Sequence, residues 1–312
     1  MPLDRNAAQL LQFLSATFPD LGGAVTDAQE ARAVLAGFGF PRGPEVAAIE
    51  YRQIPGDPPI PVRIYWPRCD VSPPYPIVVY FHGGGFVLCD LDSHDGVCRS
   101  LANEAAVIVV SVDFRLAPEH KYPAAVDDAY AATVWAAAEA ASLGGDPARV
   151  AVAGDSSGGT LAAVTCLRAR DEQGPDLAWQ LLLYPAIDWH ADDLPSRKEN
   201  AEGYFMTMKH MEWYAEQYLD DLSQAREPYA APGRADNLAG LPPGLVMTAE
   251  YCPLRDEGEA YAARLAADGV AATCHRVRGL FHGFFGLGPY IPAARDAEKL
   301  AGTRLRAALN PR

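Results

Sequence analysis

The chain has 312 residues and a formal net charge of −14, and no Gly/Ser-rich or Pro-rich linker divides it. A single large domain accounts for this length. The acidic balance argues against nucleic acid and against an anionic membrane surface as partners, because both bind basic proteins. No run of about 18 apolar residues occurs, so the sequence predicts no membrane span.

The six cysteines form neither a CxxC pair nor a compact disulfide framework. Reduced thiols are the default for such spacing. The N-terminus also lacks a basic stretch followed by a long apolar one, which is the pattern of a secretory signal. The sequence therefore predicts a cytoplasmic protein without a signal peptide.

In chain order, residues 5–40 show the spacing of one or two amphipathic helices, the second begun by Thr26. Alternation then predicts two strands at 49–51 and 62–66, which we expect to be antiparallel because no helix separates them. Six further apolar runs follow at 77–81, 107–112, 150–153, 181–184, 245–249 and 272–277. Strands of this kind that alternate with helices predict an α/β fold, with a mostly parallel eight-stranded sheet and helices on both faces.

Residues 190–230 break this rhythm, since a helix carrying Trp213, Tyr214 and Tyr218 does not fit a sheet element. We interpret them as an insertion that folds over the sheet edge with the N-terminal helices and shapes a pocket. The expected organisation is cap helices in residues 1–45 and a main domain in residues 46–312 with a cap insertion at about 190–230. Four aromatic residues of the cap region are expected either to line the pocket or to pack in the core: Phe40, Tyr204, Phe205 and Trp213.

The strongest chemical signal is Gly154-Asp155-Ser156-Ser157-Gly158, which follows a predicted strand and precedes an Ala/Leu-rich helix. G-x-S-x-G in that context is the pattern of a nucleophile elbow, whereas a bare match would be an ordinary glycine turn. The sharp turn exposes the serine, the glycines permit close packing, and the helix N-terminus supplies N–H groups. Ser156 is therefore the predicted nucleophile.

A second signal, His82-Gly83-Gly84-Gly85, directly follows the strand at 77–81. Consecutive glycines let the backbone approach a substrate and point N–H groups at the charge that develops on a carbonyl oxygen. We expect the N–H groups of Gly83, Gly84 and Ser157 to form this oxyanion hole. His82 itself is expected to be structural.

A third signal is His282, in a loop after the last predicted strand. Among the seven histidines it is the one placed in a loop after both the nucleophile and the acid position, which is the chain order expected when a nucleophile elbow stands on an α/β sheet. We expect His282 to act as general base toward Ser156 and then as general acid toward the leaving alcohol.

Together these motifs resemble the hormone-sensitive-lipase-like family of carboxylesterases, of the α/β-hydrolase superfamily. The likeness runs from about residue 45 onward and includes Asp113-Phe114-Arg115-Leu116-Ala117-Pro118-Glu119, Tyr184-Pro185, Pro253-Leu254-Arg255-Asp256-Glu257-Gly258 and His282-Gly283-Phe284. It implies the α/β-hydrolase fold with a helical cap, and hydrolysis of short- to medium-chain acyl esters through an acyl-enzyme intermediate. It also implies that no cofactor is needed, and no metal site is expected.

One position departs from the family pattern: Cys252 stands before Pro253-Leu254, where the resemblance implies the acid of the triad. A carboxylate there accepts the histidine Nδ1–H, fixes the tautomer and stabilises the imidazolium. A neutral thiol does this poorly, and loss of a triad Asp costs roughly 10⁴-fold in kcat elsewhere.

Several explanations stay open for the acid. It has moved to Asp256 or Glu250, which we favour, or to Asp188. Alternatively, Cys252 works as a thiolate whose pKa is lowered by a protonated histidine beside it. Two explanations remain: the enzyme works as a Ser–His dyad of reduced activity, or the residue at position 252 has been altered.

The expected function is a serine carboxylesterase acting on a small-molecule ester. A ligand-binding protein on a degenerate hydrolase scaffold is the alternative from another class; the lost acid supports it, and the intact Ser156 and His282 oppose it. A deacetylase or amidase would share the same machinery. No nucleic-acid or membrane partner is expected, and a homodimer is allowed.

Overall fold

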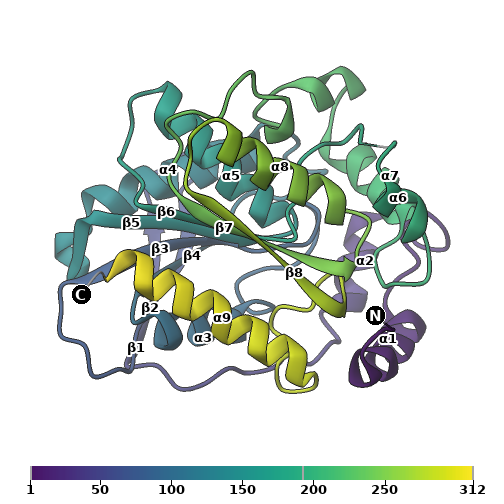
Figure 1. The fold of residues 1–312 in the computed structure, drawn as a ribbon, viewed down its shortest axis with the longest axis horizontal. Helices are drawn as coiled ribbons and strands as arrows, with labels where there is room; N and C mark the ends of the chain where they lie inside the picture. The colour runs from purple at the N-terminus through teal and green to yellow at the C-terminus, as the bar shows by residue number, and fades with distance from the viewer. Residues whose placement is uncertain (1, 192, 311–312) are drawn as a thin grey trace.

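The computed structural model describes residues 2–191 and 193–310, and in this part of the chain one sheet of eight strands lies between two layers of helices (Figure 1). The strands are β1 (Ala48–Ile54), β2 (Ile60–Trp66), β3 (Tyr75–Phe81), β4 (Ile108–Val112), β5 (Gly145–Asp155), β6 (Trp179–Leu183), β7 (Gly244–Tyr251) and β8 (Ala272–Phe281). Their order in the sheet is β1-β2-β4-β3-β5-β6-β7-β8. β2 pairs antiparallel with β1 and β4, and the other neighbours are parallel. The predicted fold class, including the antiparallel first strands, is confirmed.

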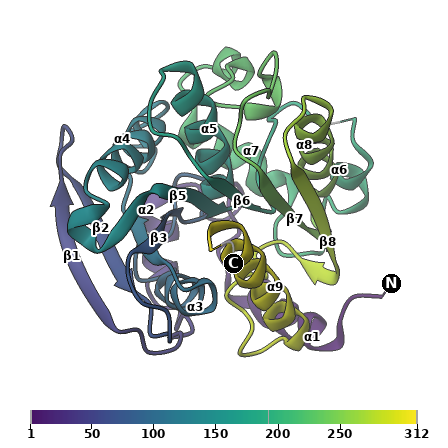
Figure 2. The ribbon, with the colours of Figure 1, turned by 60° about the vertical axis from the view of Figure 1, so that its left-hand side comes forward.

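Helices cover both faces of this sheet (Figures 1 and 2). One face carries α4 (Ala124–Ala138), α5 (Ser157–Asp171) and α8 (Arg255–Ala267), and the opposite face carries α3 (Asp95–Ala105) and α9 (Pro292–Leu309). None of the helices in the described residues is long and apolar enough to cross a bilayer.

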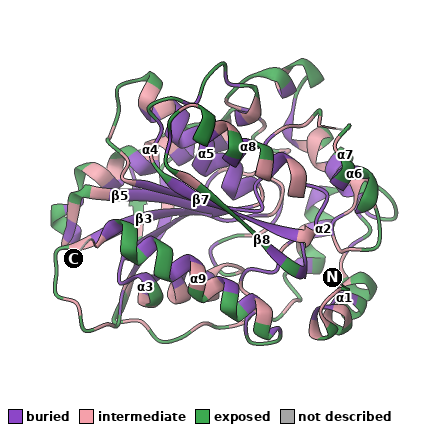
Figure 3. Ribbon diagram, in the orientation of Figure 1, coloured by how far each residue is buried: buried purple, intermediate pink, exposed green. Residues whose placement is uncertain are grey.

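Successive residues of a central strand point into two separate apolar cores. In β3, Ile77 and Val79 belong to the core that includes α4, α5 and α8, whereas Val78 and Tyr80 belong to the core that includes α3 and α9. All four side chains are fully buried, as the central strands in Figure 3 show. A strand buried on both faces needs apolar residues at nearly every position, which explains the unbroken runs in the sequence.

Two segments far apart in the sequence lie together near one end of the sheet, and we call them the covering segments. The first, residues 2–45, contains α1 (Arg5–Thr17) and α2 (Ala28–Leu35). The second, residues 190–230, contains α6 (Pro195–Glu199), α7 (Met208–Tyr218) and the 3₁₀ turn η2 (Leu222–Arg226); residue 192 lies outside the described residues.

Polar and aromatic contacts join the two covering segments. Trp213 Nε1 donates a hydrogen bond of 2.9 Å to Thr26 O, and the rings of Phe18 and Phe205 meet edge to face at 4.8 Å. Asp27, rather than the expected Thr26, caps α2, because its carboxylate accepts a 2.9 Å bond from Glu30 N.

Candidate active site

Four loops that carry the predicted motifs meet at one edge of the sheet. His82 follows β3, Ser156 follows β5, Cys252 follows β7 and His282 follows β8. These strands are parallel, so their carboxyl ends lie on the same side, which is where α/β sheets place their ligand sites. Ser156 and His282, which are 126 positions apart, are thereby brought into contact.

Ser156 occupies a sharp turn between β5 and α5, with φ 54° and ψ −121°. A non-glycine residue in that conformation is strained, as a nucleophile elbow requires. The neighbours must be glycine: a Cβ on Gly158 would lie 2.0 Å from Phe81 O, and one on Gly154 would lie 2.2 Å from Gly158 O. The backbone of Ser156 is anchored by its N–H, which donates to Leu183 O at 2.8 Å.

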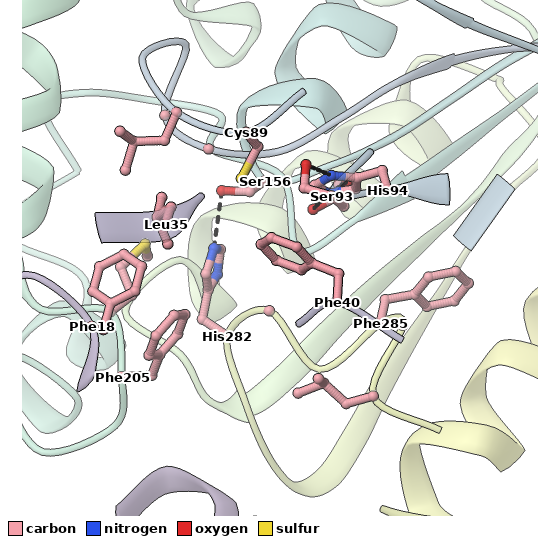
Figure 4. Close-up of a pocket in the computed structure, with 18 of the residues that line it drawn as sticks. Phe18, Leu35, Phe40, Cys89, Ser93, His94, Ser156, Phe205, His282 and Phe285 are labelled. Atoms are coloured by element: carbon pink, nitrogen blue, oxygen red, sulfur yellow. Dashed lines mark hydrogen bonds and ion pairs between the residues drawn. The ribbon is translucent and has the colours of Figure 1, made fainter. Parts of the chain in front are cut away.

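His282 faces the serine. Its Nε2 lies 2.9 Å from Ser156 Oγ (dashed in Figure 4), and the ring packs against Tyr184 with centroids 4.8 Å apart. Only 6% of the His282 surface is exposed. The distance and burial suit proton transfer between the hydroxyl and the imidazole.

Cys252 stands behind the histidine, where the triad acid was expected. Its Sγ lies 3.2 Å from His282 Nδ1 and also accepts a 3.3 Å hydrogen bond from Leu254 N. The thiol is fully buried. Ser156, His282 and Cys252 therefore form one continuous chain of contacts.

Burial favours the neutral form of both the thiol and the imidazole. It raises the pKa of Cys252 well above the usual range of a thiol. It also lowers the pKa of His282 to about 4, an effect that the negative charge of Asp155 partly opposes. Burial therefore opposes both charges of the expected alternative, a Cys252 thiolate beside a protonated histidine.

The neutral pair has two tautomers with opposite consequences. For Ser156 to donate its proton to Nε2, the imidazole proton must be on Nδ1 and donate to Cys252 Sγ, a weak acceptor. In the other tautomer the Cys252 thiol donates to Nδ1, and Nε2–H faces Ser156 and cannot take the serine proton. A carboxylate would exclude this second form, whereas the thiol permits it.

The carboxylates proposed as relocated acids lie in other contacts. Asp256 accepts hydrogen bonds from Ser196 N at 2.8 Å and from Arg255 Nε at 2.7 Å, because the first turn of α8 directs it toward α6. Glu250 accepts from Gly279 N at 2.7 Å. Asp188 pairs with Arg234 at 2.9 Å. The structure brings none of the three to His282, so the predicted relocation to Asp256 was wrong.

The glycine loop after β3 corrects one predicted oxyanion donor. Gly83 N donates to Asp155 Oδ1 at 3.0 Å, so the prediction for Gly83 was wrong. Gly84 and Gly85, with φ of 110° and 63°, instead line the cavity at Ser156. Within the described part of the chain, the N–H groups of Gly84, Gly85 and Ser157 have no hydrogen-bond acceptor.

His82, expected to be structural, is fully buried and stacks on Phe114 with ring centroids 4.3 Å apart. Its Nδ1 lies 2.7 Å from Gly83 O. Burial lowers the pKa of His82 to about 4.

A cavity of about 200 Å³ opens beside Ser156 and His282. Its walls are mostly apolar and come largely from the covering segments and from the loop after β8 (Figure 4): Leu14, Phe18, Leu35, Phe38, Phe40, Phe205, Met206, Phe285 and Leu287. Phe40 and Phe205 thus line the pocket, as one of the two expectations for them stated. Trp213 is buried in the core instead.

Among the described residues, no group of three or more His, Cys, Asp or Glu side chains is placed to hold an ion.

Comparison with known proteins identifies the family. Residues 78–286 match a family model described as alpha/beta hydrolase fold. The chain is 48% identical to Esterase LipI of Mycobacterium tuberculosis over 254 residues, which are 81% of this chain and 79% of that protein. It is 43% identical to Carboxylesterase NlhH of the same species over 311 residues, 96% of each protein.

A solved structure shows the same architecture over almost the whole chain. The hyperthermophilic esterase of the archaeon Pyrobaculum calidifontis superimposes with a TM-score of 0.90 at 42% identity, covering 98% of this chain and 99% of that one. With the elbow, the histidine and the glycine loop in place, the chain belongs to the hormone-sensitive-lipase-like carboxylesterases of the α/β-hydrolase fold.

Proposed function

We propose that this protein is a serine carboxylesterase that hydrolyses small acyl esters. The observation that carries the proposal is the 2.9 Å contact between Ser156 Oγ and His282 Nε2, two residues that line an apolar cavity. The named esterases among its relatives support the same reaction class.

The first half of the reaction forms an acyl-enzyme. Ser156 Oγ attacks the ester carbonyl carbon while its proton passes to His282 Nε2. The N–H groups of Gly84, Gly85 and Ser157 donate to the oxyanion that develops. His282 then gives the proton to the alcohol oxygen, the C–O bond breaks, and the acyl group stays on Ser156.

The second half of the reaction hydrolyses the acyl-enzyme and regenerates the free enzyme. A water molecule, deprotonated by His282, attacks the acyl carbonyl, and the carboxylic acid leaves as Ser156 regains its proton. Throughout both halves, Cys252 Sγ accepts the Nδ1–H of His282. It holds the ring in place but supplies no negative charge to the imidazolium.

We propose short- to medium-chain esters as substrates. A cavity of about 200 Å³ is smaller than the pockets of roughly 300–1,000 Å³ that enclose drug-sized ligands. We also propose that the protein works in the cytoplasm, because all six cysteines are free, as a reducing compartment keeps them. A homodimer stays a prediction.

The test uses p-nitrophenyl acetate, butyrate and octanoate with the parent protein and Ser156→Ala. The parent should release p-nitrophenol, faster from butyrate than from octanoate, and a phosphonate inhibitor should label Ser156 in the intact mass and peptide spectra. Hydrolysis that survives Ser156→Ala unchanged would refute the serine mechanism. Absence of both hydrolysis and labelling in the parent would favour a ligand-binding protein instead.

A further inference from the structure

The reaction sequence makes no use of Asp155, a buried carboxylate at the cavity. Asp155 immediately precedes Ser156, is 7% exposed, and lines the same cavity as Ser156 and His282. Burial opposes its ionisation, but His94 and Tyr80 outweigh that effect and hold the pKa of Asp155 below its ordinary value. A negative charge therefore stands next to the nucleophile.

Three groups hold this carboxylate in place. Asp155 Oδ1 accepts hydrogen bonds from Tyr80 Oη at 2.7 Å and from Gly83 N at 3.0 Å. His94 Nε2 lies 3.2 Å from the same oxygen and 3.5 Å from Oδ2. Through these contacts Asp155 ties the end of β3, the glycine loop and the start of α3 to the elbow.

The protonated form of His282 requires a negative charge nearby to stabilise it. When Ser156 attacks, His282 becomes an imidazolium in a buried pocket, and its neighbour on Nδ1 is the neutral thiol of Cys252. Asp155 lines the same cavity as His282, and its negative charge favours the protonated form of the imidazole. A carboxylate in a poorly solvated pocket acts over a longer distance than one in water.

We propose that Asp155 is a positioning residue with an electrostatic role: from the cavity that both residues line, it stabilises the His282 imidazolium in place of the carboxylate that Cys252 lacks. The same side chain fixes the glycine loop through Gly83. The inference rests on the proposed serine mechanism, because it concerns the base of that mechanism.

Several other groups surround Asp155 and His282. Ser156, Cys252 and the ring of Tyr184 face His282. On the Asp155 side, Tyr80 and His94 contact the carboxylate, and a positive charge on His82 would lower the pKa of Asp155.

The variant Asp155→Asn tests the negative charge of Asp155 separately from its hydrogen bonds. Asn has the same shape, and its Oδ1 can still accept from both Tyr80 and Gly83. Its amide nitrogen takes the place of Oδ2, beside His94 Nε2. The variant therefore removes the negative charge while the support of the glycine loop persists.

The experiment measures the acid limb of kcat/KM on p-nitrophenyl butyrate in the Cys252→Asp background, where that limb falls in an accessible pH range. Adding Asp155→Asn should move the limb to lower pH by roughly one unit and reduce kcat roughly tenfold. The matched control is Tyr80→Phe, which removes one hydrogen bond from the same oxygen and keeps the charge. It should leave the limb where it was.

A limb that Asp155→Asn does not move would overturn the inference, even if kcat falls, because a purely structural role leaves the ionisation of His282 unchanged. Should the Asn variant fail to fold by circular dichroism, Asp155→Ser gives a smaller uncharged side chain with the same two outcomes. Loss of activity in Ser156→Ala tests the serine mechanism separately, so the two proposals can fail independently.

Discussion

Replacing Cys252 with Asp should convert a weak triad into a strong one. Cys252 Sγ already lies 3.2 Å from His282 Nδ1, and Leu254 N donates to it from the other side at 3.3 Å. A carboxylate at this position would keep both donors as charge-assisted hydrogen bonds. It would also exclude the tautomer that leaves a proton on Nε2.

The size of the gain follows from the ionisation of His282. Its pKa of about 4 lies below the ordinary imidazole value of 6.5, a difference of about 3 kcal/mol at 1.36 kcal/mol for each pH unit. A contact carboxylate that restores this loss, in a transition state with a full imidazolium, should raise kcat roughly 10²–10³-fold. KM should change little, because Cys252 does not line the cavity.

The assay compares the parent, Cys252→Asp and Cys252→Asn by steady-state hydrolysis of p-nitrophenyl butyrate between pH 4 and 9. Asn is the matched control, since it has the shape of Asp without the charge, and it should gain little or nothing. The acid limb of kcat/KM should shift to higher pH in Cys252→Asp alone. Equal rates for Asp and Asn, or no gain for Asp in a folded protein, would refute the reasoning.

Four further outcomes follow from the site. Ser156→Ala should lower kcat at least about 10⁴-fold, with an unchanged circular dichroism spectrum. In the parent, His282 must be neutral to act as base, so kcat/KM should fall only as the pH drops through about 4. A fall of kcat/KM near pH 6.5 would contradict the lowering of the His282 pKa by burial. Gly85→Ala should cost roughly 10²–10³-fold in kcat, because its Cβ would lie 2.2 Å from the Tyr214 ring at a φ of +63°; retained activity would place the oxyanion donors elsewhere. Phe205→Ala should raise the octanoate-to-butyrate ratio of kcat/KM roughly tenfold, and an unchanged ratio would remove Phe205 from the acyl site.

The sequence predicted the roles of Ser156 and His282 because each lies in a short motif and the two occur in the expected order along the chain. Each residue follows a recognisable apolar strand, and parallel strands bring their carboxyl ends to one edge regardless of loop length. Neither position depends on knowing where a particular side chain points.

The wrong predictions concern the direction in which an N–H group or a side chain points, and not the position of a residue along the chain. Whether Gly83 or Gly85 presents its N–H to the cavity depends on φ at Gly84 and on the capture of Gly83 N by Asp155, and neither is visible in a run of three glycines. Asp256 lies one helical turn beyond Cys252, but α8 directs it toward Ser196. The importance of Asp155 was missed for the same reason, since its partners Tyr80 and His94 are distant in the sequence.

The reacting groups and the cavity wall come from different parts of the chain. Ser156, Cys252 and His282 follow strands of the sheet, whereas much of the wall belongs to the two covering segments, residues 2–45 and 190–230. Ester preference can therefore evolve by exchange of side chains on those segments while the chemistry of the sheet edge stays intact. A combinatorial library confined to the wall positions of the covering segments should yield altered substrate preferences among many variants that still fold.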